Sequence, residues 1–94
     1  MSITDTHHVT DLDLTERAWL RAVDTHDGAC ARRNELANSI IAYVVDHDTP
    51  QIDRAFVQTL IDEWKVANSE TLGLLSRRVA AFILYRDELQ RTHA

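Results

Sequence analysis

The sequence predicts an all-α protein, and three observations favour that class. Apolar residues recur at spacings of three and four over most of the chain, which is the period of an amphipathic helix. Strand-like alternation of apolar and polar residues is missing. The chain holds two glycines and one proline, too few turn residues for an all-β or α/β fold. We therefore expect an antiparallel helical hairpin or a small helical bundle.

The chain has 94 residues, which suit one domain with a modest core. Residues 1–11 are polar and lack periodicity, so we expect a flexible N-terminal tail before a single helical domain over residues 12–94. Two neighbouring histidines in that tail, His7 and His8, predict no metal site, because a site needs further ligands fixed in space. The sequence shows no secretion or membrane signal, which favours a cytoplasmic location.

The first helix is expected to begin near Asp13 or Thr15. Asp13 and Glu16 have the spacing of a capping box. Alternatively Thr15 caps the helix, and Leu14 and Trp19 then form a hydrophobic staple. Both interpretations start the helix at the same place.

Gly28 interrupts the apolar stripe of the first half. Glycine costs about 1 kcal/mol relative to alanine inside a helix, yet the phase of the stripe is unchanged across it. Either one helix runs through residues 15–46 or two helices meet at Gly28. His26 falls on the inward side, where we expect a hydrogen-bonded core histidine. Cys30, the single cysteine, is interpreted as a small buried thiol.

The segment Asp46–Pro50 is predicted to be the turn of the hairpin. Pro50 disfavours helical geometry at Thr49 and suits the first turn of a following helix. Asp48 and Gln51 have capping-box spacing at the start of that second helix.

In the second half, Asn68 and Ser69 could cap a new helix at Glu70, and Gly73 is another weak point. We therefore expect the long helices to be broken near Gly28 and Ser69. Residues 79–85 are apolar nearly all round, which is typical of a central helix or a subunit interface.

The apolar surface exceeds what one helical hairpin can bury, because a hairpin covers one stripe per helix. We therefore expect a homodimer in which two hairpins form a larger bundle. The function we favour is a small non-enzymatic adaptor or regulatory protein that binds another protein. The interface candidates are Trp19, Ile40, Ile41, Val44, Trp64, Phe82 and Tyr85.

Net charge argues against a nucleic-acid partner. The chain carries −5 overall, whereas nucleic-acid binders usually present a basic face. The DNA-binding alternative is a helix-turn-helix over residues 69–86, with Arg77, Arg78 and Arg86 directed toward phosphates.

Two acidic clusters with histidine are the strongest candidates for chemistry. They are Asp24–His26–Asp27 and Asp46–His47–Asp48. About 18 helical residues separate them, roughly 27 Å, and the side chains within each cluster fan around the helix. We therefore predict no metal, no cofactor and no catalytic residue. Gly-rich phosphate loops and HExxH or nucleophile-elbow motifs are also missing from the sequence.

One enzyme alternative rests on a set of residues spread over both halves of the chain: Arg17, Asp24, Arg32, Arg33, Asn34, Glu35, Leu36, Pro50, Asp53, Arg54 and Gln90. Their pattern resembles that of small all-α chorismate mutases of the AroQ type. The chain length is similar, and so are several residues that lie roughly in register over residues 14–90. The family's lysine after the arginine patch would fall near residues 43–45, where no basic residue stands, and its glutamate falls on Ala55. The resemblance implies helical-bundle geometry.

Overall fold

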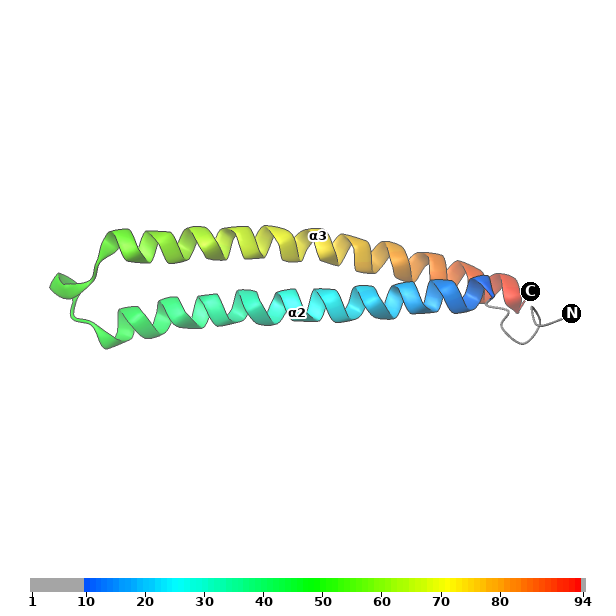
Figure 1. Ribbon diagram of the computed structural model, residues 1–94, viewed down its shortest axis with the longest axis horizontal. Helices are drawn as coiled ribbons and strands as arrows, with labels where there is room; N and C mark the ends of the chain where they lie inside the picture. The colour runs from blue at the N-terminus through cyan, green and yellow to red at the C-terminus, as the bar shows by residue number, and fades with distance from the viewer. Residues whose placement is uncertain (1–9, 94) are drawn as a thin grey trace, which may run out of the picture.

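In the computed structural model, which describes residues 10–93, the chain is an antiparallel hairpin of two long helices (Figure 1). Helix α2 spans Asp11–Asp46, a 3-10 turn η1 spans Thr49–Gln51, and helix α3 spans Arg54–Thr92. The described residues contain no strand. The predicted all-α hairpin is confirmed.

The hairpin is a single extended layer. Its radius of gyration is 21.1 Å and its extents are 74 × 27 × 16 Å, whereas a compact domain of this length has a radius of gyration of about 12 Å. The two helices lie side by side along their length, and the start of α2 and the end of α3 meet at the same end (Figure 1). Each helix can therefore bury only the stripe that faces the other.

Helix α2 begins at Asp11, earlier than the expected start at Asp13 or Thr15. The N-cap is Thr10, whose hydroxyl oxygen accepts a hydrogen bond from the Asp13 amide at 3.1 Å, while the Thr10 amide donates to the Asp13 carboxylate at 3.3 Å. The capping-box prediction was therefore wrong in register, because Asp13 is the third helical residue and not the cap. The expected tail, with His7 and His8, lies outside the described residues apart from Thr10 and Asp11.

The turn lies where the sequence predicts it, with α2 ending at Asp46. Pro50 lies in η1 and not in the second helix, and the Asp48 side chain makes no capping hydrogen bond. Helix α3 is capped by Asp53, whose carboxylate accepts from the Phe56 amide at 3.1 Å. The Asp53 amide donates to the hydroxyl of Tyr43 at 3.1 Å. This contact ties the start of α3 to the end of α2.

Both helices are continuous, so the predicted breaks near Gly28 and Ser69 were wrong. At Gly28 and Gly73 a helical backbone costs about 1 kcal/mol relative to alanine, which packing along a helix of 36 or 39 residues offsets. Asn68 does not cap a new helix, because its side-chain oxygen accepts a hydrogen bond from Arg33 of α2 at 3.5 Å. Asn68 thus lies within the continuous helix α3, and its side chain contacts α2.

Shielded residues alternate in steps of three and four along each helix, which is the heptad period of a coiled coil. We call these residues the seam. On α2 the seam is Leu12, Thr15, Trp19, Ala22, His26, Ala29, Arg33, Leu36, Ile40 and Tyr43. On α3 it is Val57, Leu60, Trp64, Ala67, Thr71, Leu74, Arg78, Ala81, Tyr85 and Glu88.

The seam is narrow in the middle of the hairpin and aromatic toward both ends. Ala29, Ala67 and Thr71 are the buried residues of the described chain, and all three have small side chains. Toward the open end, Trp19 stacks on Tyr85 with ring centroids 5.3 Å apart. Toward the turn, the rings of Tyr43 and Phe56 lie 5.0 Å apart. Aromatic contacts therefore hold the two ends of a thin core.

Candidate interaction surface

The seam divides the surface of the hairpin into two flanks. Residues that follow a seam position lie on one side of each helix, and residues that precede a seam position lie on the other side. Because the helices are antiparallel, the following residues of both helices share one flank. Arg32 and Glu70, which both precede the seam, form an ion pair across the other flank at 3.7 Å.

We call the first of these the apolar flank. It runs along both helices from the turn to the open end, and most of its residues are hydrophobic. Its polar residues are Asp13, Glu16, Asp27, Asn34, Gln58, Lys65, Asn68 and Arg86. Its apolar residues are Leu20, Val23, Cys30, Ala37, Ile41, Val44, Ile61, Leu72, Leu75, Val79, Phe82 and Leu89.

Large side chains on the apolar flank stay in contact with solvent in the hairpin. Ile41 is 60% exposed, Leu72 57% and Val79 50%. The partly shielded helical residues outside the seam all lie on this same flank, beside the seam: Val23, Cys30, Ala37, Ile61, Asn68 and Leu89. The apolar surface therefore extends from the seam onto one side of the molecule, with polar residues at intervals along it.

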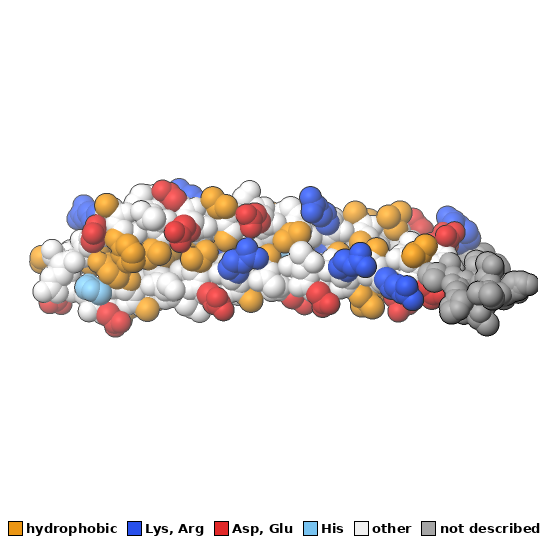
Figure 2. Space-filling view, viewed as in Figure 1, with side chains coloured by type: hydrophobic (Ala, Val, Ile, Leu, Met, Phe, Trp, Pro, Cys, Tyr) orange, Lys and Arg blue, Asp and Glu red, His pale blue; other side chains and the backbone are white. Residues whose placement is uncertain are grey.

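The other side, the charged flank, alternates basic, acidic and small residues: Arg21, Thr25, Gly28, Arg32 and Glu35 on α2, and Glu63, Glu70, Gly73, Arg77 and Ala80 on α3. Isolated hydrophobic residues lie among them. In the face drawn in Figure 2, Lys, Arg, Asp and Glu side chains are spread along both helices, and hydrophobic side chains gather in the seam near the turn.

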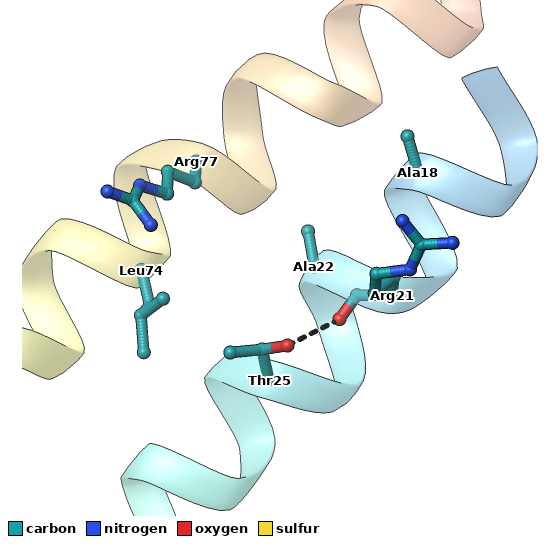
Figure 3. A pocket seen from close by; sticks show the side chains of 6 residues that line it. All are labelled: Ala18, Arg21, Ala22, Thr25, Leu74 and Arg77. Atoms are coloured by element: carbon teal, nitrogen blue, oxygen red, sulfur yellow. Dashed lines mark hydrogen bonds between the residues drawn. The ribbon is translucent and has the colours of Figure 1, made fainter. Parts of the chain in front are cut away.

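A shallow hollow lies on the charged flank, where Leu74 and Arg77 of α3 face Ala18, Ala22 and Thr25 of α2 (Figure 3). Its volume is about 200 Å³, below the range of about 300–1,000 Å³ that small-molecule sites occupy. A neighbouring hollow is lined by Glu70, Gly73, Leu74 and Arg77, all from α3. Both hollows are shallow, and charged side chains line both of them, Arg21 and Arg77 in the first and Glu70 and Arg77 in the second.

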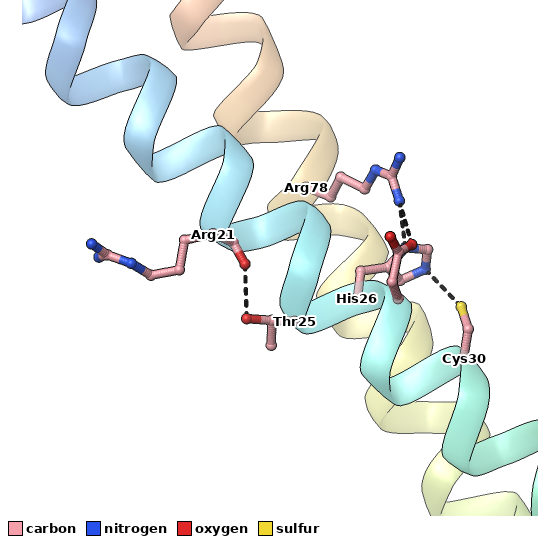
Figure 4. A network of polar contacts seen from close by, with 6 residues as sticks. Arg21, Thr25, His26, Cys30 and Arg78 are labelled. Atoms are coloured by element: carbon pink, nitrogen blue, oxygen red, sulfur yellow. Dashed lines mark hydrogen bonds and ion pairs between the residues drawn. The ribbon is translucent and has the colours of Figure 1, made fainter.

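One polar network crosses the seam in the middle of the hairpin (Figure 4). The Arg78 guanidinium donates to His26 Nδ1 and to the Asp27 carboxylate, each at 3.1 Å. A neutral His26 ring that accepts at Nδ1 carries its proton on Nε2, which lies 3.5 Å from Cys30 Sγ. His26 is thus half-buried and hydrogen-bonded, as the sequence predicts. The network satisfies polar groups at a seam position, and Cys30 at its edge is a half-buried free thiol, more exposed than the sequence predicts.

The seven interface candidates from the sequence fall into two groups. Trp19, Ile40, Trp64 and Tyr85 lie in the seam and pack inside the hairpin. Ile41, Val44 and Phe82 lie on the apolar flank, where they are 60%, 41% and 38% exposed.

Sequence reasoning missed most of the α3 portion of the flank, namely Leu72, Leu75 and Val79. The signal was present as a second set of apolar residues, in three-and-four spacing, one position after the seam. A period of 3.6 merges the two sets into one broad stripe, whereas the heptad period separates them.

The other candidate clusters do not converge in the hairpin. Within residues 10–93, no group of three or more His, Cys, Asp and Glu side chains could hold a metal ion. His47 stacks on Tyr43, and its Nδ1 donates to the Tyr43 carbonyl at 2.8 Å. Arg17 and Arg54, which carry part of the enzyme resemblance, lie near opposite ends of the hairpin, about 44 Å apart along the axis. The helix-turn-helix over residues 69–86 was wrong, because this segment is one continuous helix.

Comparisons with protein-family models, with curated proteins and with solved structures found no match to this chain. Among the described residues, neither helix combines the length and the hydrophobicity that a membrane crossing requires.

Proposed function

We propose that this chain is a small non-enzymatic adaptor or regulatory protein of the cytoplasm that works by binding protein through its apolar flank. The observation that carries the proposal is the row of exposed hydrophobic side chains on one side of an extended hairpin. Side chains such as Leu72, Val79 and Phe82 contact solvent there. Burying one such side chain stabilises a complex by about 1.5–3 kcal/mol, so a partner that covers several of them binds firmly.

The hairpin supports this function by its shape. Two continuous helices hold the flank residues at fixed spacing, so the surface needs little ordering when it binds. Amphipathic helices recognise partners by such rows of side chains at three-and-four spacing. The opposite flank, rich in both signs of charge, remains in water and keeps the complex soluble.

Site-specific photo-crosslinking in the native cells tests the proposal. Leu75→benzoylphenylalanine places the reactive group on the apolar flank, and Arg77→benzoylphenylalanine, two residues away on the charged flank, is the matched control. We expect discrete protein adducts from position 75 and few from position 77. Equal labelling from both positions, or none from position 75, would contradict the proposal. The adduct masses also distinguish a second copy of the 10.7 kDa chain from another protein.

A further inference from the structure

We infer that the apolar flank is covered by a second copy of this chain, packed face to face with both turns at the same end, as a four-helix bundle with a two-fold axis along its length. This inference rests on the proposed function and names the partner of that surface. It follows from the levels of the flank residues along the hairpin, from their charges and from the area of the face.

Contacts across the seam fix which residues of α2 and α3 are level. Trp19 lies beside Phe82 with ring centroids 5.2 Å apart, Arg32 pairs with Glu70, and Tyr43 lies beside Phe56. Counting from these contacts along two antiparallel helices gives the level pairs on the apolar flank. Those alike in polarity are Leu20 with Phe82, Val23 with Val79, Cys30 with Leu72, Asn34 with Asn68, and Ile41 with Ile61, and those unlike in polarity are Asp13 with Leu89, Asp27 with Leu75, Ala37 with Lys65, and Val44 with Gln58.

A two-fold axis along the hairpin lays α3 of one subunit over α2 of the other at the same level. Each subunit's Phe82 then meets the partner subunit's Leu20, and Val79 meets Val23. Near the middle, Asn68 meets Asn34, two amides that can hydrogen-bond to each other. Most level pairs therefore match in polarity. Among the exceptions, Asp27, which is paired with Arg78 of its own chain, faces Leu75, and Lys65 faces Ala37.

Charge at the open end matches the same arrangement. Glu16 and Arg86 both lie on the apolar flank and are level with each other. Neither belongs to the ion pairs of the described residues, which join Arg32 to Glu70, Arg78 to Asp27 and Arg91 to Glu88. In the bundle, Arg86 of each subunit lies over Glu16 of the other, so the two-fold axis forms this pair twice.

The opposite orientation, with the turns at different ends, gives a poorer match. At full overlap it lays α3 on α3, so that Phe82 faces the partner's Lys65 and Val79 faces the partner's Asn68. It also lays α2 on α2, which puts Glu16 over the partner's Ile41. Hydrophobic side chains would then bury charged groups without partners, which is costly.

The area of the face suffices for a stable dimer. Helix α3 is about 58 Å long, and the hairpin is 27 Å wide. Contact over half of that outline covers about 800 Å² on each subunit, which equals a standard protein–protein interface.

Charge reversal in mixed samples tests both the occupant and its orientation. Full-length Glu16→Arg and Arg86→Glu are made separately and studied by sedimentation equilibrium at low salt. The unmodified chain is expected at twice 10.7 kDa. Each variant alone repels its own copy at two places, so we expect about tenfold weaker dimerisation.

Mixing the two variants restores both pairs between chains, so the mixture is expected to dimerise as tightly as the unmodified chain. A pair within one chain cannot produce this rescue, because mixing leaves each chain unchanged. A dimer that is weakened by neither variant, or that mixing does not restore, would overturn the inferred orientation. Helix content from circular dichroism shows that each variant is folded.

Cysteine pairing is a second measurement that does not depend on the charges. In a Cys30→Ser background, Val23→Cys and Val79→Cys are made in separate chains and oxidised together. The inferred bundle predicts a disulfide between unlike chains in the mixture and little within either sample alone. An Asn68→Cys chain mixed with Val79→Cys is the control, because those positions meet only when the turns lie at opposite ends.

A chain that remains at 10.7 kDa up to high micromolar concentration would overturn the inference. The proposed function would still stand if position 75 crosslinks to a different protein. A monomeric chain that also gives no crosslink from position 75 would contradict the proposed function as well. The failure of the dimer and the failure of the function are therefore distinguishable.

Discussion

The two flanks of the hairpin are built from the same two helices and differ by the residue before or after each seam position. Arg77 and Arg78 show how one step away from the seam changes the contacts that a side chain makes. Arg78 lies in the seam and donates to His26 and Asp27, whereas Arg77 lines a shallow hollow on the charged flank. In a heptad seam, one step along the chain turns a side chain by about 100°. The position of a residue relative to the seam, more than its type, therefore determines its burial and its contacts.

The largest expected effect comes from removing hydrophobic side chains on one flank only. Leu72→Ser with Val79→Ser deletes two apolar contacts per subunit, each contributing about 2 kcal/mol. We expect the dimer to dissociate, and the melting temperature measured by circular dichroism to fall and lose its dependence on protein concentration.

Val66→Ser with Leu84→Ser is the matched control, because these exposed side chains lie on the charged flank. The control is expected to change the mass and the melting temperature little. If the control dissociates the dimer and the double variant does not, the charged flank is the interface and the comparison is reversed.

A smaller effect is expected from the two neighbouring arginines. Arg78→Ala removes the hydrogen bonds to His26 and Asp27 and should lower the free energy of unfolding by about 1 kcal/mol, an amount reduced by the partial exposure of the pair. Arg77→Ala should change it by less than about 0.5 kcal/mol. Urea denaturation of both variants at equal concentration measures the difference. Equal losses would show that the polar network across the seam adds nothing to stability.

Much of this fold is predictable from the sequence, because local patterns determine it. The scarcity of glycine and proline, together with Pro50 after a long apolar run, predicts a hairpin and its turn. The caps were not predictable, because Thr10, Asp13, Asp48 and Asp53 all suit a helix start, and the choice depends on contacts such as that between Tyr43 and Asp53.

The surface was only partly predictable, because hydrophobic spacing alone does not say which apolar residue faces the other helix. Trp19 and Phe82 both appear as aromatic anchors in the sequence. The structure buries one face of Trp19 in the seam, where it stacks on Tyr85, and leaves Phe82 38% exposed on the apolar flank. This distinction requires the cross-helix register, which the sequence does not state.

The smallest expected effect is a gain in stability at the two glycines. These substitutions alter the charged flank and so test whether it, and not the apolar flank, is the interface. Gly28 and Gly73 lie in helices on the charged flank, and a Cβ atom at either position would meet open space. Gly28→Ala and Gly73→Ala should each raise the free energy of unfolding by about 0.5–1 kcal/mol, because alanine loses less backbone entropy in a helix.

Denaturation followed by sedimentation measures both the stability and the mass of these variants. If the apolar flank is the interface, the added methyl groups leave the dimer intact. If the charged flank were the interface, the glycines would be the points where a second backbone approaches closely. In that case alanine would weaken association while stabilising the isolated helix. A stabilised variant that remains dimeric therefore excludes close packing at these glycines and leaves the apolar flank as the surface that a second copy covers.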